Sequence, residues 1–134
     1  MIACGTGRTT LLCIRETDWL PLHEVAAQLA ARADVLVFHY DEFEHNSASS
    51  AVLVGLSTGV PVLTSATNWF DDHGDAVYRA DRNADGLAAG LERLLEDDEL
   101  RDRTVAAARE YCASNSWART AARHVDLWNS FGIG

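Results

Sequence analysis

The sequence predicts an α/β fold, with a parallel sheet of about four strands flanked by helices and a final third that is helical. Short unbroken apolar runs at 35–38 and 62–63 are typical of strands that are covered on both faces. They alternate with segments whose apolar residues recur at helical spacing. From residue 87 onward only the helical spacing remains, so we expect helices alone in that part of the chain.

The stretch from 33 to 64 organises the prediction, because it has the pattern of strand, loop, helix and strand. Asn46 or Ser47 can N-cap the helix of this unit, while Gly59 can end it and Pro61 prevents its continuation. The next strand begins at Val62. In a parallel β-α-β unit, the polar start of the helix lies at the carboxyl end of the first strand, which is a common place to hold an anionic ligand.

The remaining elements follow in order. We expect a strand at 9–14, an amphipathic helix at 22–32, a long loop at 65–75 and a short strand at 76–79. Three helices should then present apolar core faces. Their stripes are Leu87, Leu91, Leu94 and Leu95; Leu100, Thr104, Ala107, Ala108 and Tyr111; and Trp117, Ala121, Val125, Trp128 and Phe131.

Composition restricts the class of protein. A chain of 134 residues is expected to form one domain, spanning 1–134. The formal net charge of −9 opposes binding to a nucleic-acid backbone. The apolar runs are too short to span a membrane, no signal peptide is evident, and Cys4, Cys13 and Cys112 lack the spacing of a metal site. We therefore expect a cytoplasmic protein without a membrane span.

Two loops carry side chains suited to chemistry. The acidic loop 41–45 includes Glu44 and His45, so it could ligate a divalent metal, supply an acid or base, or form a solvated rim at a cleft. No second ligand cluster has a matching spacing, so no metal is expected. In the loop after 64, Trp69 and Phe70 could cover a ligand or pack the loop onto the domain.

Six motifs occur in the order found in one enzyme family. They are LPxxEVA from residue 20, ADVLV from 33, GVPVLTS from 59, GDAV from 74, GLAxxLxxLLED from 86 and SWxxTA from 116. Together they resemble the C-terminal, donor-binding domain of a family 4 glycosyltransferase of the GT-B fold, from about residue 10 to 131. The resemblance implies a Rossmann-like domain that holds a nucleotide-diphosphate sugar and needs no metal or other cofactor.

The resemblance also suggests site residues and shows two departures. The family usually carries glutamates where this chain has Asn46 and Val54, and valine cannot accept a hydrogen bond from the ribose. The serine-rich helix start resembles a variant branch of the family. The implied diphosphate-binding residues are Tyr40, Asn46, Ser47, Ser49 and Ser50, and the implied sugar or base contacts are Glu44, His45, Thr64 and Trp69. No catalytic residue is assigned.

The second departure is that the match lacks the family's N-terminal domain and the first strands of its C-terminal domain. One edge of the strand at 35–38 would then lie open. The strand at 9–14, residues 2–4 or the strands of a second copy could cover this edge, and we expect a homodimer or strand exchange. A homodimer partner or a separate N-terminal domain would also have to complete the cleft. Two functions follow. The chain could be the donor-binding part of a retaining glycosyltransferase completed by a partner, or a non-catalytic Rossmann-like domain used for oligomerisation or protein interaction.

Overall fold

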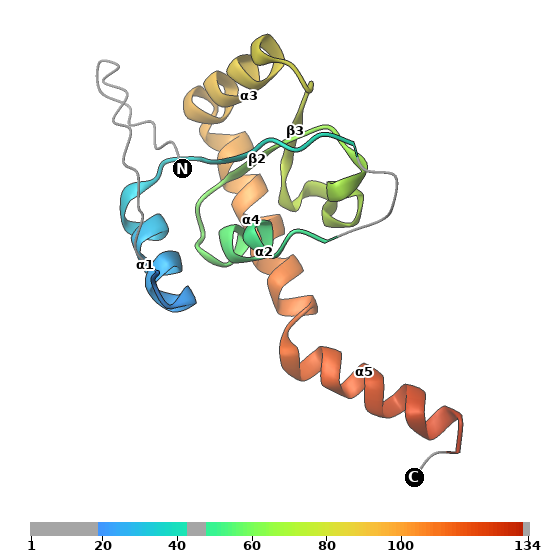
Figure 1. Ribbon diagram of the computed structural model, residues 1–134. Helices are drawn as coiled ribbons and strands as arrows, with labels where there is room; N and C mark the ends of the chain where they lie inside the picture. Colours follow the sequence, from blue (N-terminus) through green and yellow to red (C-terminus); the bar gives the residue numbers. More distant parts are fainter. Residues whose placement is uncertain (1–18, 43–47, 133–134) are drawn as a thin grey trace.

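The computed structural model describes residues 19–42 and 48–132 (Figure 1). The elements are α1 (Leu22–Arg32), β1 (Leu36–Phe38), α2 (Ser50–Ser57), β2 (Val62–Ser65), the 3₁₀ helix η1 (Asn68–Ala76), β3 (Tyr78–Ala80), α3 (Ala84–Glu96), α4 (Asp98–Ser114) and α5 (Trp117–Ser130). The predicted helices in 22–32 and in the last third of the chain are confirmed.

The described strands form one open parallel sheet in the order β1-β2-β3. Leu36 pairs with Val62, and Leu63 pairs with Tyr78. The α/β class with a parallel sheet is thus confirmed, with three strands in the described part of the chain. The fourth expected strand, at 9–14, lies outside the described residues. Among the described residues, β1 pairs only with β2, so its other edge has no strand beside it.

Both faces of the sheet carry apolar side chains, because successive residues of a strand point to opposite sides. On one face α2, α4 and η1 enclose a core of Leu36, Val52, Leu56, Val62, Phe70, Val77 and Ala108, with Leu29 of α1 at its margin. On the other face α3 packs over Val35, Leu63 and Ala80 through its buried residue Leu94. Gly90 permits this close approach, since a Cβ there would lie 2.9 Å from the Cβ of Ala80.

Side-chain caps define where the helices begin. The N-cap residues Ser49, Asn83, Asp97 and Ser116 each accept a hydrogen bond from a backbone amide of the first turn. The N-cap of α2 is therefore Ser49, and the prediction of Asn46 or Ser47 is corrected. The helix ends at Ser57, and Gly59 follows with φ 77°, as expected from its conformational freedom.

The segment between β2 and β3 differs from the prediction. Residues 65–75 were expected to be a loop, yet most of them belong to η1, which buries Phe70, His73 and Ala76 on one side. The third strand was expected at 76–79 and instead spans Tyr78–Ala80. The kink at Gly74, with φ 52°, lies between the turns of η1 and leads the chain toward β3.

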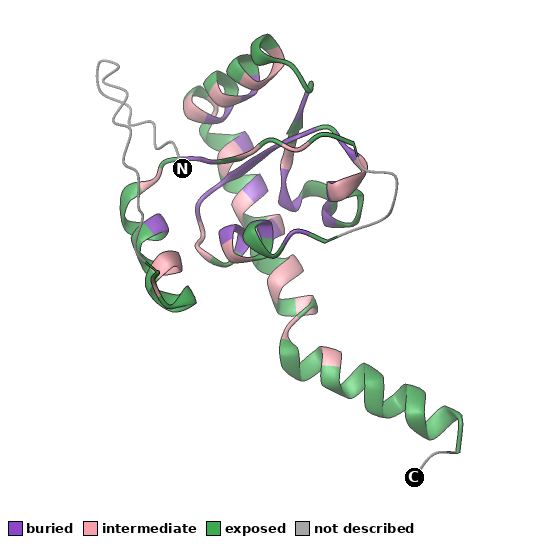
Figure 2. Ribbon diagram, in the orientation of Figure 1, coloured by how far each residue is buried: buried purple, intermediate pink, exposed green. Residues whose placement is uncertain are grey.

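The prediction of a core face for the last helix is wrong. No residue of α5 is buried, and Trp117 is 91% exposed. Figure 2 shows α5 extending away from the rest of the molecule, exposed along its length. Its apolar stripe is present in the sequence, but nothing among the described residues covers it.

None of the helices in 19–42 and 48–132 is both long and apolar enough to cross a bilayer.

Candidate functional site

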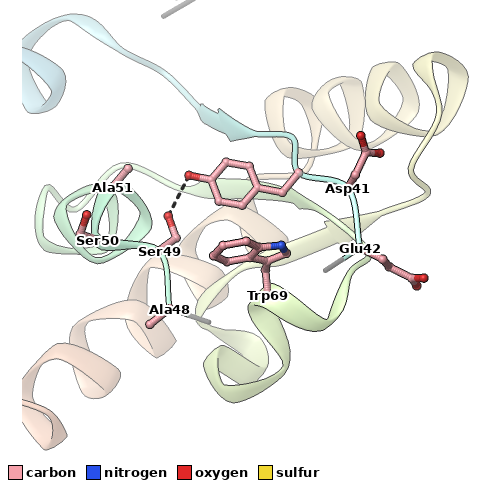
Figure 3. A pocket seen from close by; sticks show the side chains of 8 residues that line it. Asp41, Glu42, Ala48, Ser49, Ser50, Ala51 and Trp69 are labelled. Atoms are coloured by element: carbon pink, nitrogen blue, oxygen red, sulfur yellow. Dashed lines mark hydrogen bonds between the residues drawn. The ribbon is translucent and has the colours of Figure 1, made fainter. Parts of the chain in front are cut away.

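A cavity of about 480 Å³ lies at the carboxyl ends of β1 and β2, beside the N-terminus of α2 (Figure 3). Its lining residues are Tyr40, Asp41, Glu42, Ala48, Ser49, Ser50, Ala51 and Trp69. They come from the segment after β1, the start of α2 and the start of η1. This is the edge at which the ligands of open parallel α/β sheets bind.

Tyr40 is held in place at both its backbone and its ring. Its backbone N–H donates to Ser65 Oγ at 2.9 Å, and the same hydroxyl donates to the Tyr40 carbonyl oxygen at 2.8 Å. The ring lies edge-on to Trp69, with centroids 5.3 Å apart, and its centroid is 5.4 Å from that of Phe70. One serine at the end of β2 therefore positions an aromatic wall of the cavity.

Ser49 and Ser50 have different positions at the start of α2. Ser49 is buried, its Oγ accepts from the Val52 amide at 3.3 Å, and it lies 2.9 Å from the Tyr40 hydroxyl. Ser50 is exposed and lines the cavity. The first amides of a helix have no intrahelical acceptor and carry partial positive charge, so this end of α2 attracts anions.

Charged side chains around the cavity are mainly acidic. Asp41 and Glu42 are exposed and line it, and no arginine is among the described residues that line it. Arg82 lies 3.9 Å from Glu42, and Arg79 forms an ion pair with Asp71 at 2.7 Å. Hydroxyl-rich ligands suit such carboxylates and aromatic walls, because carboxylates accept hydrogen bonds from hydroxyl groups. An anionic group would depend on the first turn of α2.

The structure brings together four of the residues that the sequence singled out. Tyr40, Ser49, Ser50 and Trp69 all line the cavity. Thr64 does not line it, since its side chain is fully buried and its Oγ1 has no hydrogen-bond partner among the described residues. The predictions for Glu44, His45, Asn46 and Ser47 lie outside the described residues.

Other residues of the site were not singled out from the sequence. Ser65 positions Tyr40, although the sequence placed it only at the start of a loop. Asp41 and Glu42 belong to the acidic loop for which the rim of a cleft was one of three stated alternatives, and they line the cavity. Their place directly after a predicted strand was the available signal, because such loops meet at one edge of a parallel sheet.

A buried histidine lies behind the aromatic wall. His73 contacts Phe70 edge-on and stacks on Tyr111, with ring centroids 5.2 Å apart. Neither ring nitrogen has a hydrogen-bond partner among the described residues. Burial lowers the pKa of His73, and the Phe70 backbone and the Asp72 carboxylate oppose this in part. Since His73 does not line the cavity, its role is in packing η1 against α4.

Burial also affects two groups on α4. It raises the pKa of the Tyr111 hydroxyl and that of the Cys112 thiol. Both groups are therefore neutral at physiological pH. Within 19–42 and 48–132, no three His, Cys, Asp or Glu side chains are grouped so that they could hold a metal ion.

No protein-family model matches this chain, and no curated protein matches it with significant similarity.

Proposed function

We propose that this chain is the donor-binding domain of a glycosyltransferase-like protein and that its cavity holds a nucleotide-diphosphate sugar. The observation that carries the proposal is the cavity itself. The amide-rich start of α2 and two aromatic rings line an open pocket of about 480 Å³ at the carboxyl edge of a parallel sheet. The resemblance of six ordered motifs to the family 4, GT-B fold enzymes supports the same assignment.

The start of α2 supports binding of the diphosphate. Ser50 and Ala51 belong to the first turn and line the cavity, so their amides and the Ser50 hydroxyl are within the reach of a ligand there. Oriented amides can hold a phosphate without a basic side chain. The Tyr40 hydroxyl, 2.9 Å from Ser49 Oγ, would supply a further donor once it exchanged that contact for a phosphate oxygen.

The opposite side of the cavity supports binding of the sugar. The carboxylates of Asp41 and Glu42 can accept hydrogen bonds from sugar hydroxyls, and Trp69 offers an apolar ring face or edge. The same carboxylates would repel a diphosphate that lay close to them. The donor should therefore bind with its phosphates toward α2 and its sugar toward Asp41 and Glu42.

The proposed domain does not complete a transferase on its own. At the position of the family's second glutamate it has Val54, a half-exposed residue of α2. An acceptor site would have to come from a homodimer partner or a separate N-terminal domain. Retaining transfer would then rest on positioning the donor and on stabilising the departing diphosphate.

Calorimetry on the full chain with uridine, guanosine and adenosine diphosphates tests the proposal, followed by the corresponding nucleotide sugars. We expect one nucleotide to bind and Ser50→Asp to weaken its binding at least about tenfold, because the new carboxylate lies where the phosphate would be. The same carboxylate favours the helix itself, since it interacts well with the positive end of the dipole. Loss of binding would thus not reflect unfolding.

Ala84→Asp is the matched control. Ala84 is the first residue of α3, as Ser50 is of α2, and it is exposed and away from the cavity. Binding should be the same as in the unmodified chain. Absence of heat with every nucleotide, or equal weakening by the two substitutions, would contradict the proposal.

The second candidate is a non-catalytic domain that acts through protein contacts. It is favoured by one observation, the exposed apolar stripe of α5. This function and donor binding are compatible, because α5 and the cavity share no described residue.

A further inference from the structure

One edge of β1 has no strand beside it among the described residues, and we refer to it as the free edge. The Leu36 N–H donates to the Pro61 carbonyl oxygen at 2.9 Å. Backbone groups of successive residues in a strand point to opposite sides, so the N–H and C=O of Val37 point toward the free edge. Val35 and Leu36 are only 3% and 4% exposed. Backbone groups of such a buried strand normally have hydrogen-bond partners, so a further strand is expected at this edge.

The described connections between strands lie on one face of the sheet. The helix α2 joins β1 to β2, η1 joins β2 to β3, and both pack in the core that contains Leu36 and Val62. Parallel strands joined through a helix almost always form a right-handed crossover. Reversing the direction of travel with the helix on the same face would reverse the hand. Right-handed crossovers on this face therefore all advance from β1 toward β3.

The helix that precedes β1 lies on the same face. Leu29 of α1 belongs to the core shared by α2 and η1, Val25 packs against that core, and α1 contacts α2. The opposite face is covered by α3, as Figure 1 shows. A right-handed crossover that passes through α1 into β1 therefore starts from a strand on the side of β1 away from β2. That side is the free edge.

The chain itself supplies a strand for this position. Residues 9–14, with the β-prone sequence TTLLCI, lie outside the described residues. The connection at 15–35 contains the 11-residue α1 and exceeds the dozen or so residues that a parallel crossover needs. We infer that residues 9–14 pair parallel with the free edge of β1 and extend the sheet to four strands. This goes beyond the proposed donor binding and does not depend on it.

Nuclear magnetic resonance of the full chain tests the inference. We expect nuclear Overhauser contacts between the backbone protons of 9–14 and those of β1, and slow exchange of the Val37 amide with solvent. Of Leu11→Pro and Leu12→Pro, one should increase that exchange rate at least about tenfold and more than the other, because only one of the two neighbouring N–H groups faces β1. Thr6→Pro is the matched control, since it places a proline in the same segment outside 9–14.

An equimolar mixture of isotope-labelled and unlabelled chains identifies the source of the strand. Contacts confined to one chain support the inference, whereas contacts between labelled and unlabelled chains would show strand exchange and overturn it. A Val37 amide that exchanges as fast as an unprotected amide would also overturn it, as would contacts of 9–14 with β3 instead of β1. The contacts are measured on the unmodified chain, so this result stands even where a proline variant fails to fold. Thermal melts identify any such variant.

Discussion

The last two helices have similar sequence patterns but differ in how far their apolar residues are buried. Both α4 and α5 begin at a side-chain cap, and both carry an apolar stripe at helical spacing. In α4 the stripe residues Leu100, Thr104 and Ala108 are buried against η1, α2 and α3. In α5 no residue is buried. A helical period therefore predicts which side of a helix is apolar, but not what covers that side.

The size of the side chains distinguishes the two stripes. The buried stripe of α4 includes small residues, which allow the close approach of its neighbours within the chain. The stripe of α5 contains the large aromatic residues Trp117, Trp128 and Phe131. Tryptophan and phenylalanine are enriched at interfaces between proteins. The composition of the stripe thus contained a signal that its spacing did not.

The largest expected difference in the free energy of unfolding is between removal of an aromatic side chain from the core and removal of one from α5. Phe70 is fully buried, so Phe70→Ala should lower the free energy of unfolding by about 3–5 kcal/mol. Trp128→Ala should change it by less than about 0.5 kcal/mol when the chain is dilute enough to be monomeric. Urea denaturation followed by circular dichroism measures both. A cost above about 2 kcal/mol for Trp128→Ala would mean that α5 packs against its own chain.

A smaller difference in stability is expected between substitutions of the two serine N-caps, Ser49 of α2 and Ser116 of α5. Ser49→Ala should lower the free energy of unfolding by about 1 kcal/mol, because it removes the cap of α2 and the partner of the Tyr40 hydroxyl. Ser116→Ala removes the cap of α5, where the bond to the Arg119 amide is 3.4 Å long. It should reduce helical ellipticity and leave the unfolding midpoint unchanged. A shift of the midpoint by Ser116→Ala would show that α5 unfolds together with the core.

The smallest expected effect is a change of stability with pH that arises from the buried side chain of His73. Burial lowers the pKa of His73 in the folded chain, so the unfolded chain binds more protons near its ordinary pKa of about 6.5. Stability should be complete above that pH and should fall as the pH decreases toward the lowered pKa. His73→Phe should remove this loss, since the ring still packs between Phe70 and Tyr111.

His124→Gln is the control for that pH series, because His124 is an exposed residue of α5. Its curve of unfolding midpoint against pH should follow that of the unmodified chain. If His73→Phe kept the whole acid dependence, the loss of stability would have to originate in other groups.

Part of the site could be predicted from sequence because it depends on local rules. Strand ends and a polar helix start predicted this edge of the sheet as a binding site, and the family resemblance implied Tyr40, Ser49, Ser50 and Trp69, all four of which line the cavity. The bridge from Ser65 to Tyr40 could not be predicted, since the two residues are 25 positions apart and meet only through the parallel pairing of β1 and β2. For Thr64, only the packed structure decides that its side chain is buried.

By itself the sequence determined the α/β class, the helical last third and the location of a polar helix start after a buried strand. These features follow from periodicity, capping and turn residues, which act over a few neighbouring positions. Only the tertiary structure decided that Ser49 caps α2, that η1 replaces a loop and that α4 is covered while α5 is not. Burial depends on which distant segment lies opposite a face, and no local pattern encodes that partner.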